Sequence, residues 1–95
     1  MDFSHPNAKW VNDLVDELED QETLTADGLD GAIVGLWIDS PSGPRVIYSQ
    51  DKCIDIFVER DRMSYEEASE YFDFNVAGAY MGPRTPIFIS TPEED

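Results

Sequence analysis

The side chains that could do chemistry in this 95-residue chain are one histidine, one cysteine and 21 carboxylates. His5 lacks the partner and the pocket that a catalytic base needs, so we interpret it as an exposed residue or as part of a helix start. Cys53 falls in the first turn of an expected helix, on its apolar face, where Asp51 and Asp55 oppose a thiolate. We therefore predict a buried core cysteine, and a single cysteine forms no internal disulfide.

The carboxylates follow no familiar metal-binding pattern. The segment 27–31, Asp-Gly-Leu-Asp-Gly, lacks the alternating oxygen ligands and the distal glutamate of an EF-hand. Asp16 and Asp20 stand one helical turn apart, as do Glu66 and Glu70, which chance alone produces in so acidic a chain. No zinc-type Cys/His cluster, phosphate-binding glycine loop or Ser/His/Asp pattern occurs. We therefore predict a protein that is not an enzyme and has neither cofactor nor metal; a carboxylate–metal enzyme is the least favoured alternative.

The net charge of −15, from 21 acidic and 6 basic residues, sets the expected partners. Such a surface repels nucleic acid and anionic membranes and attracts basic protein surfaces, including those that normally hold nucleic acid. The longest apolar stretch, 32–38, is too short to span a bilayer, and the first ten residues lack the pattern of a signal peptide. We therefore expect a cytoplasmic protein with neither nucleic acid nor membrane as a direct partner.

Hydrophobic spacing predicts three helices to position these side chains. The first, over 6–20, is capped by Ser4 and carries an apolar stripe. The second, over 52–62, has Asp51 as its N-cap. The third, over 65–79, begins with a capping box in which Ser64 caps the helix and Glu67 reaches back. Glycine 78 or 82 ends it.

Two apolar runs, 32–38 and 45–49, are typical of strands, and the turn residues between them predict an antiparallel hairpin. A third strand is expected over 85–90. The fold is therefore predicted to be α+β, one domain over 1–95 with a small, mostly antiparallel sheet and flexible ends at 1–5 and 91–95. The large side chains expected to anchor its core are Trp10, Trp37, Phe57, Phe72, Phe74 and Phe88.

Two helices carry the acidic residues that are the remaining candidates for a site. The partner-binding residues that we predict are Asp13, Asp16, Glu17 and Asp20 on the first helix and Glu66, Glu70 and Asp73 on the third. Neighbours four residues apart stand about 6 Å apart along a helix axis. Carboxylates spaced in this way could imitate a row of phosphates for a protein that binds nucleic acid through lysine and arginine. The alternative is a solvated face that serves solubility or adaptation to high salt.

Residues 51–89 carry a resemblance in the runs 51–54, 63–68, 70–76, 78–80 and 85–88, with the strand 33–37 as a further part of it. In these runs the chain resembles a family of small bacteriophage and prophage proteins that has no established activity. The resemblance implies a phage or mobile-element setting, in which small acidic proteins often bind and disable host defence proteins or host enzymes. The acidic first helix, over 6–20, is not part of the resemblance.

Two hypotheses follow. The first is a non-enzymatic accessory protein in the host cytoplasm that binds a basic surface of a host protein, as an inhibitor or nucleic-acid mimic of a defence system. The alternative is a structural or assembly protein that forms a homo-oligomer and whose acidity keeps it soluble. Exposed apolar surface beyond the core would favour the alternative.

Overall fold

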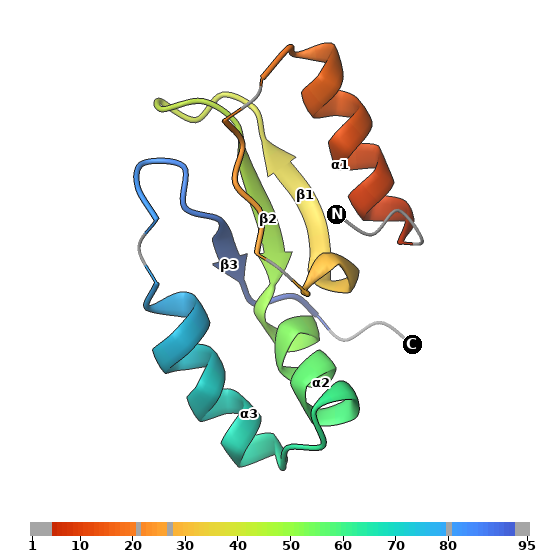
Figure 1. The fold of residues 1–95 in the computed structure, drawn as a ribbon, viewed down its shortest axis with the longest axis vertical. Coiled ribbons are helices and arrows are strands. Elements are labelled where there is room, and N and C mark those ends of the chain that lie inside the picture. The colour runs from red at the N-terminus through yellow and green to blue at the C-terminus, as the bar shows by residue number, and fades with distance from the viewer. Residues whose placement is uncertain (1–4, 21, 27, 80, 93–95) are drawn as a thin grey trace.

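A computed structural model describes residues 5–20, 22–26, 28–79 and 81–92. Its helices and strands follow one another along the chain as shown in Figure 1. Their bounds are α1 Pro6–Glu17, the 3₁₀ turn η1 Asp30–Ala32, β1 Ile33–Trp37, β2 Arg45–Ser49, α2 Gln50–Arg60, α3 Tyr65–Phe72, the π-helical segment η2 Asp73–Ala77 and β3 Ile87–Ile89.

The sheet confirms the predicted α+β fold and corrects one detail of it. Strands β1 and β2 form the expected antiparallel hairpin, with Leu36 opposite Val46 and a bulge between residues 33 and 35. Strand β3 pairs with β2 in parallel, with Phe88 beside Tyr48, so the sheet is mixed in the order β1-β2-β3. Parallel neighbours need a long crossover connection, and α2 and α3 supply it between β2 and β3.

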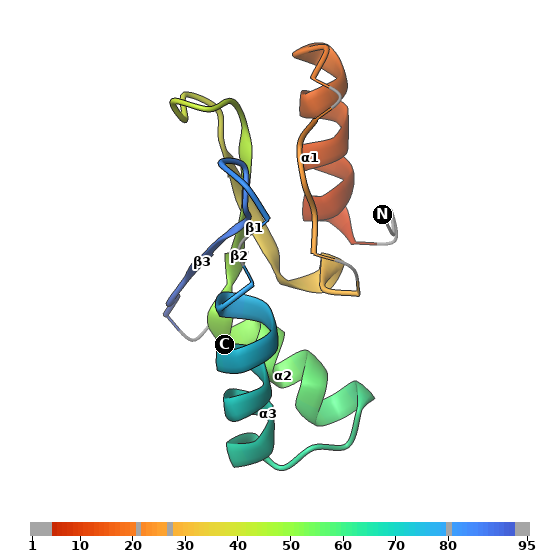
Figure 2. The same cartoon turned by 60° about the vertical axis from the view of Figure 1, so that its left-hand side comes forward.

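The helices leave one face of the sheet without a helix. Figure 2 shows α1 on one side of the sheet and α2 and α3 beyond its lower end, while the opposite side carries no helix. The described residues extend 40 × 27 × 22 Å, and α1 and α3 lie toward opposite ends of the long axis (Figure 1). The Asn7 amide of α1 fastens that helix to the sheet by donating a hydrogen bond of 2.9 Å to the Ile33 carbonyl.

The buried apolar side chains form one core between the sheet, the three helices and η1. Its members are Ala8, Val11, Leu29, Ala32, Ile33, Val46, Tyr48, Cys53, Ile54, Phe57, Ala68 and Phe72. Phe88 packs against this core, with its ring centroid 5.2 Å from that of Phe72. Phe57, Phe72 and Phe88 thus lie where we predicted core anchors.

The other three predicted core anchors are wrong: Trp10, Trp37 and Phe74 are 53%, 40% and 82% exposed. Phe74 follows the buried Phe72 by two residues, and helical side chains two positions apart point to nearly opposite faces. Trp10 stands beside the buried stripe of α1, whereas Trp37 lies on the sheet face without a helix. There the Arg45 guanidinium stacks over the indole, 5.7 Å from its centroid.

Two helices have bounds that differ from the prediction because local hydrogen bonds compete with the helix. Helix α1 ends at Glu17 rather than at residue 20, since Glu19 takes the left-handed φ of 56° and the Asp20 carboxylate caps the following turn. Helix α2 spans 50–60 rather than 52–62, because the Ser49 hydroxyl, not Asp51, accepts the hydrogen bond from the Lys52 amide.

Helix α3 begins as predicted and ends earlier. The capping box of Ser64 and Glu67 is confirmed, with both reciprocal hydrogen bonds present. The helix is regular only to Phe72 and then widens into the π-helical segment η2, which Gly78 follows. The predicted cap Ser4, and residues 1–4 and 93–95 of the predicted flexible ends 1–5 and 91–95, lie outside the described part. Thr91 is held by hydrogen bonds to Ser49 and Asp51.

The predicted core cysteine is confirmed and has a testable chemical consequence. Cys53 is fully buried on α2, and its burial raises the pKa of the thiol to about 12. We expect the folded protein to react with a thiol reagent such as Ellman's reagent at pH 8 far more slowly than the unfolded chain, because the thiolate is the reactive form. A stopped-flow trace in buffer and in guanidinium chloride measures this. Equal rates in the two solutions would contradict it.

Candidate functional site

The acidic residues of α3 and of η2, which continues it, are exposed to solvent. Glu66, Glu70 and Asp73 are exposed, and none forms an ion pair within the part of the chain that the structure describes. Glu66 and Glu67 lie in the first turn of α3, where the positive end of the helix dipole favours carboxylates. The aromatic ring of Phe74 is exposed beside them, one turn beyond Glu70.

The acidic residues of α1 are a separate group. Asp16 and Glu17 are exposed, and Asp13 forms an exposed ion pair of 2.7 Å with Lys9 one turn earlier. Since α1 and α3 lie toward opposite ends of the molecule, the seven predicted residues do not form one surface (Figure 1). A single rigid partner of ordinary size would contact one group or the other.

Asp20, the seventh predicted residue, is engaged within the fold. The Arg84 guanidinium donates to both of its carboxylate oxygens, at 2.6 and 2.7 Å, and the Asp20 and Arg84 side chains are only 15% and 19% exposed. The Arg84 hydrogen bond, joined by one from the Thr23 hydroxyl, lowers the pKa of Asp20 from 3.8 to about 2. The sequence could not reveal this pair, because its members are 64 residues apart.

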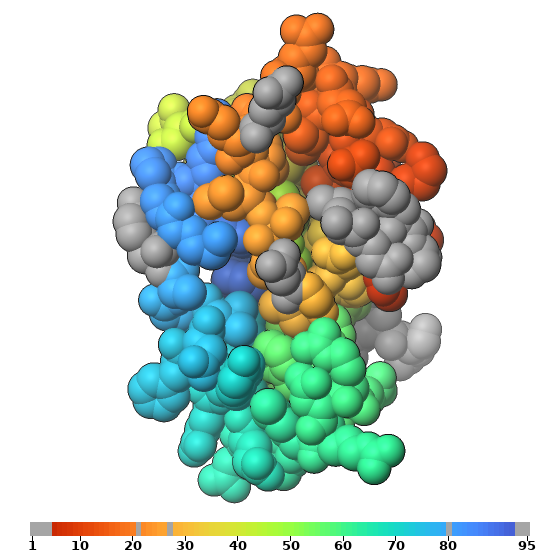
Figure 3. Space-filling view, in the orientation of Figure 1, coloured from red at the N-terminus to blue at the C-terminus, as the bar shows by residue number. Residues whose placement is uncertain are grey.

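A groove opens on the side of the sheet that α1 covers, with a volume of about 360 Å³. One wall is the loop before η1, which we call the front loop (residues 22–26 and 28–29), and the other wall is α3 with η2. In Figure 3 this hollow lies between the orange front loop and the light-blue end of the helix. The side chains of the front loop that line it are Thr25, Ala26 and Leu29, and those of the helix wall are Tyr71, Asn75, Val76 and Ala79.

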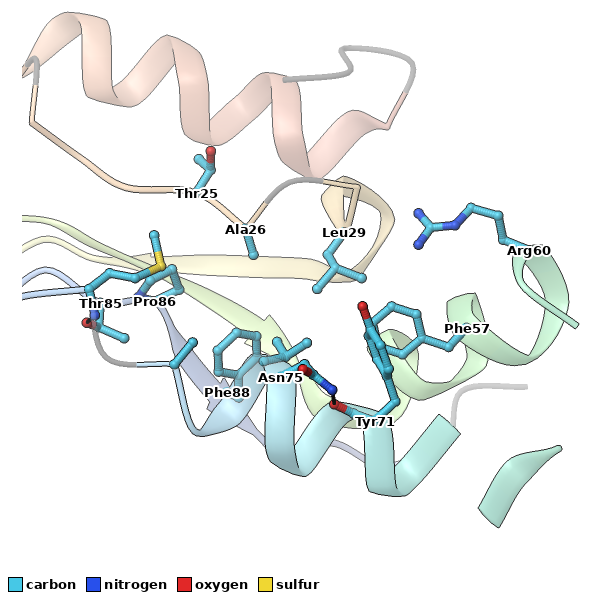
Figure 4. Close-up of a pocket in the computed structure, with 13 residues that line it drawn as sticks. Thr25, Ala26, Leu29, Phe57, Arg60, Tyr71, Asn75, Thr85, Pro86 and Phe88 are labelled. Atoms are coloured by element: carbon cyan, nitrogen blue, oxygen red, sulfur yellow. Dashed lines mark hydrogen bonds between the residues drawn. The ribbon is translucent and has the colours of Figure 1, made fainter. Parts of the chain in front are cut away.

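Aromatic rings line the inner part of the groove, as Figure 4 shows. Phe57 and Phe88 come from α2 and β3, and the Tyr71 ring meets Phe57 edge-on at 5.0 Å. Arg60 stands at one end, where its guanidinium donates to the Gly28 carbonyl at 2.7 Å and pairs with Asp61. The groove is completed by Met81, Thr85 and Pro86, in the turn before β3. Although most of the lining side chains are apolar, polar atoms contribute nearly half of the exposed lining of the groove.

A second, more open hollow lies on the other side of the same helix wall. We call it the acidic hollow; its lining residues are Met63, Glu67, Glu70, Tyr71, Phe74 and Asn75, and its volume is about 310 Å³. Tyr71 and Asn75 line both hollows, so they form the ridge between them. Glu70 is the predicted site residue that borders this hollow.

The aromatic and amide residues of this site were not predicted from the sequence. The outward orientation of Tyr71 and Phe74 had a signal in their spacing, since a helix that buries Phe72 and Ala68 must turn residues 71 and 74 outward. The π-helical turn itself had no such signal. It is accompanied by a hydrogen bond of 3.3 Å from the Asn75 side-chain amide to the Tyr71 carbonyl. Wide turns of this kind occur frequently at functional sites.

Other kinds of site find little support in the described residues. Among them, no group of three or more His, Cys, Asp or Glu side chains could hold a metal ion. His5, at the N-cap of α1, packs its ring over Gly31. No described helix is long and apolar enough to cross a membrane. Comparisons with protein-family models, curated proteins and solved structures returned no match.

The ion pair of Asp20 predicts a pH dependence of stability. The folded state holds the carboxylate ionised, with its pKa lowered from 3.8 to about 2, so the pair stabilises the fold above pH 4 and loses this effect as the pH falls toward 2. We expect Asp20→Asn to lower the Tm at pH 7, and the difference from the wild type to vanish near pH 2.

Thermal unfolding followed by circular dichroism from pH 7 to pH 2 measures this difference. Asp16→Asn is the matched control, because Asp16 is exposed and forms no ion pair with a described residue; its Tm should stay near the wild-type value or rise. A constant Tm difference for Asp20→Asn across the range would contradict the proposed cause.

Proposed function

We propose that this protein is a non-enzymatic binding protein that occupies a basic, nucleic-acid-binding surface of another protein through α3. The observation that carries the proposal is the outer face of α3 and of η2 after it, where Glu66, Glu70 and Asp73 are exposed beside the ring of Phe74 and form no ion pair with any described cation. Carboxylates on a rigid helix attract lysine and arginine, and a neighbouring aromatic ring supplies the apolar contact that interfaces concentrate in few residues.

The distribution of charge supports α3 over α1 as the contact surface. On α1, Lys9 already neutralises Asp13, and Asp20 is turned inward to Arg84. The remaining acidic residues of the chain contribute to a negative field that speeds the encounter with a basic partner. The resemblance of residues 51–89 to bacteriophage and prophage proteins supports a host defence protein or host enzyme as that partner, and inhibition by nucleic-acid mimicry as the outcome.

Two variants with the same change in charge test the proposal. Glu66→Gln/Glu70→Gln/Asp73→Asn alters α3, and Asp13→Asn/Asp16→Asn/Glu17→Gln alters α1; each removes three negative charges. Immobilised wild-type protein should retain basic proteins from a bacterial lysate at low salt and release them at high salt or on addition of duplex DNA. For the purified partner, we expect the α3 variant to bind about tenfold more weakly, a difference of about 1.4 kcal/mol, and the α1 variant nearly as well as the wild type.

Two results would contradict the proposal. If no basic protein is retained at low salt, the proposal is wrong. If the two variants weaken binding equally, the attraction is a general effect of net charge and α3 is not the contact surface. Circular dichroism of both variants checks that the helices persist.

A second function, assembly with copies of itself, is favoured by the sheet face that carries no helix. By strand register, Trp37, Ile47, Ile87 and Ile89 point to this face, and the three strands contain no aspartate or glutamate. An apolar, acid-free face in a chain of charge −15 would let two copies pack sheet against sheet while their acidic surfaces point away from each other.

Light scattering at increasing protein concentration separates this function from the first. If the face mediates assembly, a dimer forms, and added salt strengthens it because salt screens the repulsion between the two chains. Ile47→Lys should then restore the monomer, while the matched change Leu18→Lys, at the exposed end of α1 and away from this face, should not. A protein that stays monomeric at high salt and high concentration contradicts assembly through this face.

A further inference from the structure

We propose that the groove and the acidic hollow together bind one segment of the partner, in which a large apolar side chain stands next to lysine or arginine. This inference rests on the proposed function and specifies the chemistry of the partner. The apolar side chain enters the groove, and the basic side chain crosses the ridge of Tyr71 and Asn75 to reach Glu67 and Glu70.

The groove has the size and lining for one apolar side chain. Its volume of about 360 Å³ is at the lower end of the range for ligand pockets, about 300–1,000 Å³, so it suits a single large group rather than a cofactor. Phe57 and Phe88 supply aromatic surface inside it (Figure 4). Leu29 and Val76 supply aliphatic surface from the two walls. An aromatic or leucine side chain placed there would lose part of its contact with water.

The acidic hollow has the complementary lining for a basic side chain. Glu67 and Glu70 provide the carboxylates, while Met63 and the rings of Tyr71 and Phe74 provide apolar surface next to them. Lysine and arginine side chains combine the same two properties, since an aliphatic stem lies along apolar surface and the charged end stays near water and carboxylates. The aromatic rings add an attraction between cation and ring face.

Arg60 gives the bound segment a direction. Its guanidinium is held on the side of the front loop by the Gly28 carbonyl at 2.7 Å and by the Asp61 carboxylate. That end therefore presents a cation already paired with Asp61, whereas α3 presents the carboxylates of Glu67 and Glu70, so a basic side chain is attracted toward α3. The arrangement selects a segment whose basic residue lies toward α3 and away from the front loop.

The test uses two synthetic peptides and a matched pair of variants. The probe is the capped peptide Gly-Phe-Lys-Gly, with its basic residue on one side of the ring only, and its partner has alanine in place of phenylalanine with the same charge. Ala79→Phe places a ring in the groove, whereas Ala77→Phe places the same ring on an exposed position of η2 that is not among the described lining residues. Binding is measured at low salt from the shifts of backbone amide signals in NMR titrations.

We expect the phenylalanine peptide to bind the wild type and Ala77→Phe about tenfold more tightly than the alanine peptide, and to shift the amides of Tyr71, Val76 and Leu29. Ala79→Phe should remove this preference and leave the weak binding of the alanine peptide unchanged. Glu67→Gln/Glu70→Gln should weaken both peptides, because both keep the lysine.

Equal binding of the two peptides, or a preference that survives in Ala79→Phe, would overturn the groove as the site of the apolar side chain. The proposed function would stand in that case, provided that the α3 charge variant still loses its basic partner. Absence of binding by either peptide at low salt overturns this inference alone. Loss of charge dependence in the lysate experiment overturns the proposed function as well.

Discussion

The ion pair between Arg84 and Asp20 joins three loops that would otherwise be independent. The Arg84 guanidinium donates hydrogen bonds to the carboxylate of Asp20, which follows α1. Its Nε also donates to the Ser42 carbonyl in the β1–β2 loop, at 2.7 Å. Gly43 leaves room for it, since a Cβ at that position would overlap the guanidinium, and its φ of +108° suits glycine. Arg84 itself belongs to the turn that leads into β3. The start of the front loop, the hairpin loop and the turn before β3 that completes the groove are therefore fixed relative to one another.

The groove depends on this constraint because its walls come from distant parts of the chain. Tyr48 strengthens the front-loop wall by accepting a hydrogen bond of 2.7 Å from the Ala26 amide, and Arg45 strengthens the turn before β3 by donating to the Thr85 carbonyl at 2.9 Å. Both residues come from β2, the central strand of the sheet. A protein whose net charge of −15 favours expansion thus keeps a fixed hollow by using two of its few arginines as internal ties.

Features that are decided by interactions close in sequence were mostly predicted correctly, and features that are decided by distant contacts mostly were not. The capping box of Ser64 and Glu67 is local, so the start of α3 could be read from four consecutive residues. The burial of Cys53 followed from helical spacing. The parallel pairing of β3 and the inward turn of Asp20 depend on contacts 40 and 64 residues apart, which leave no local pattern. The groove is a product of such contacts, and only its separate walls had a signal in the sequence.

Charge and shape have different roles in the proposed interaction. Exposed carboxylates act over about 8 Å at physiological salt, so they speed the approach of any basic surface without choosing among such surfaces. Discrimination among basic partners requires contact at short range, where an apolar side chain of the partner either fits the groove or leaves the apolar lining of the groove in contact with water. Helix α3 and the η2 segment that continues it place both kinds of contact on one stretch of chain, with Glu70 and Phe74 outward and Val76 and Ala79 toward the groove. Loss of the groove would therefore leave a protein that still meets basic partners quickly but no longer prefers one of them.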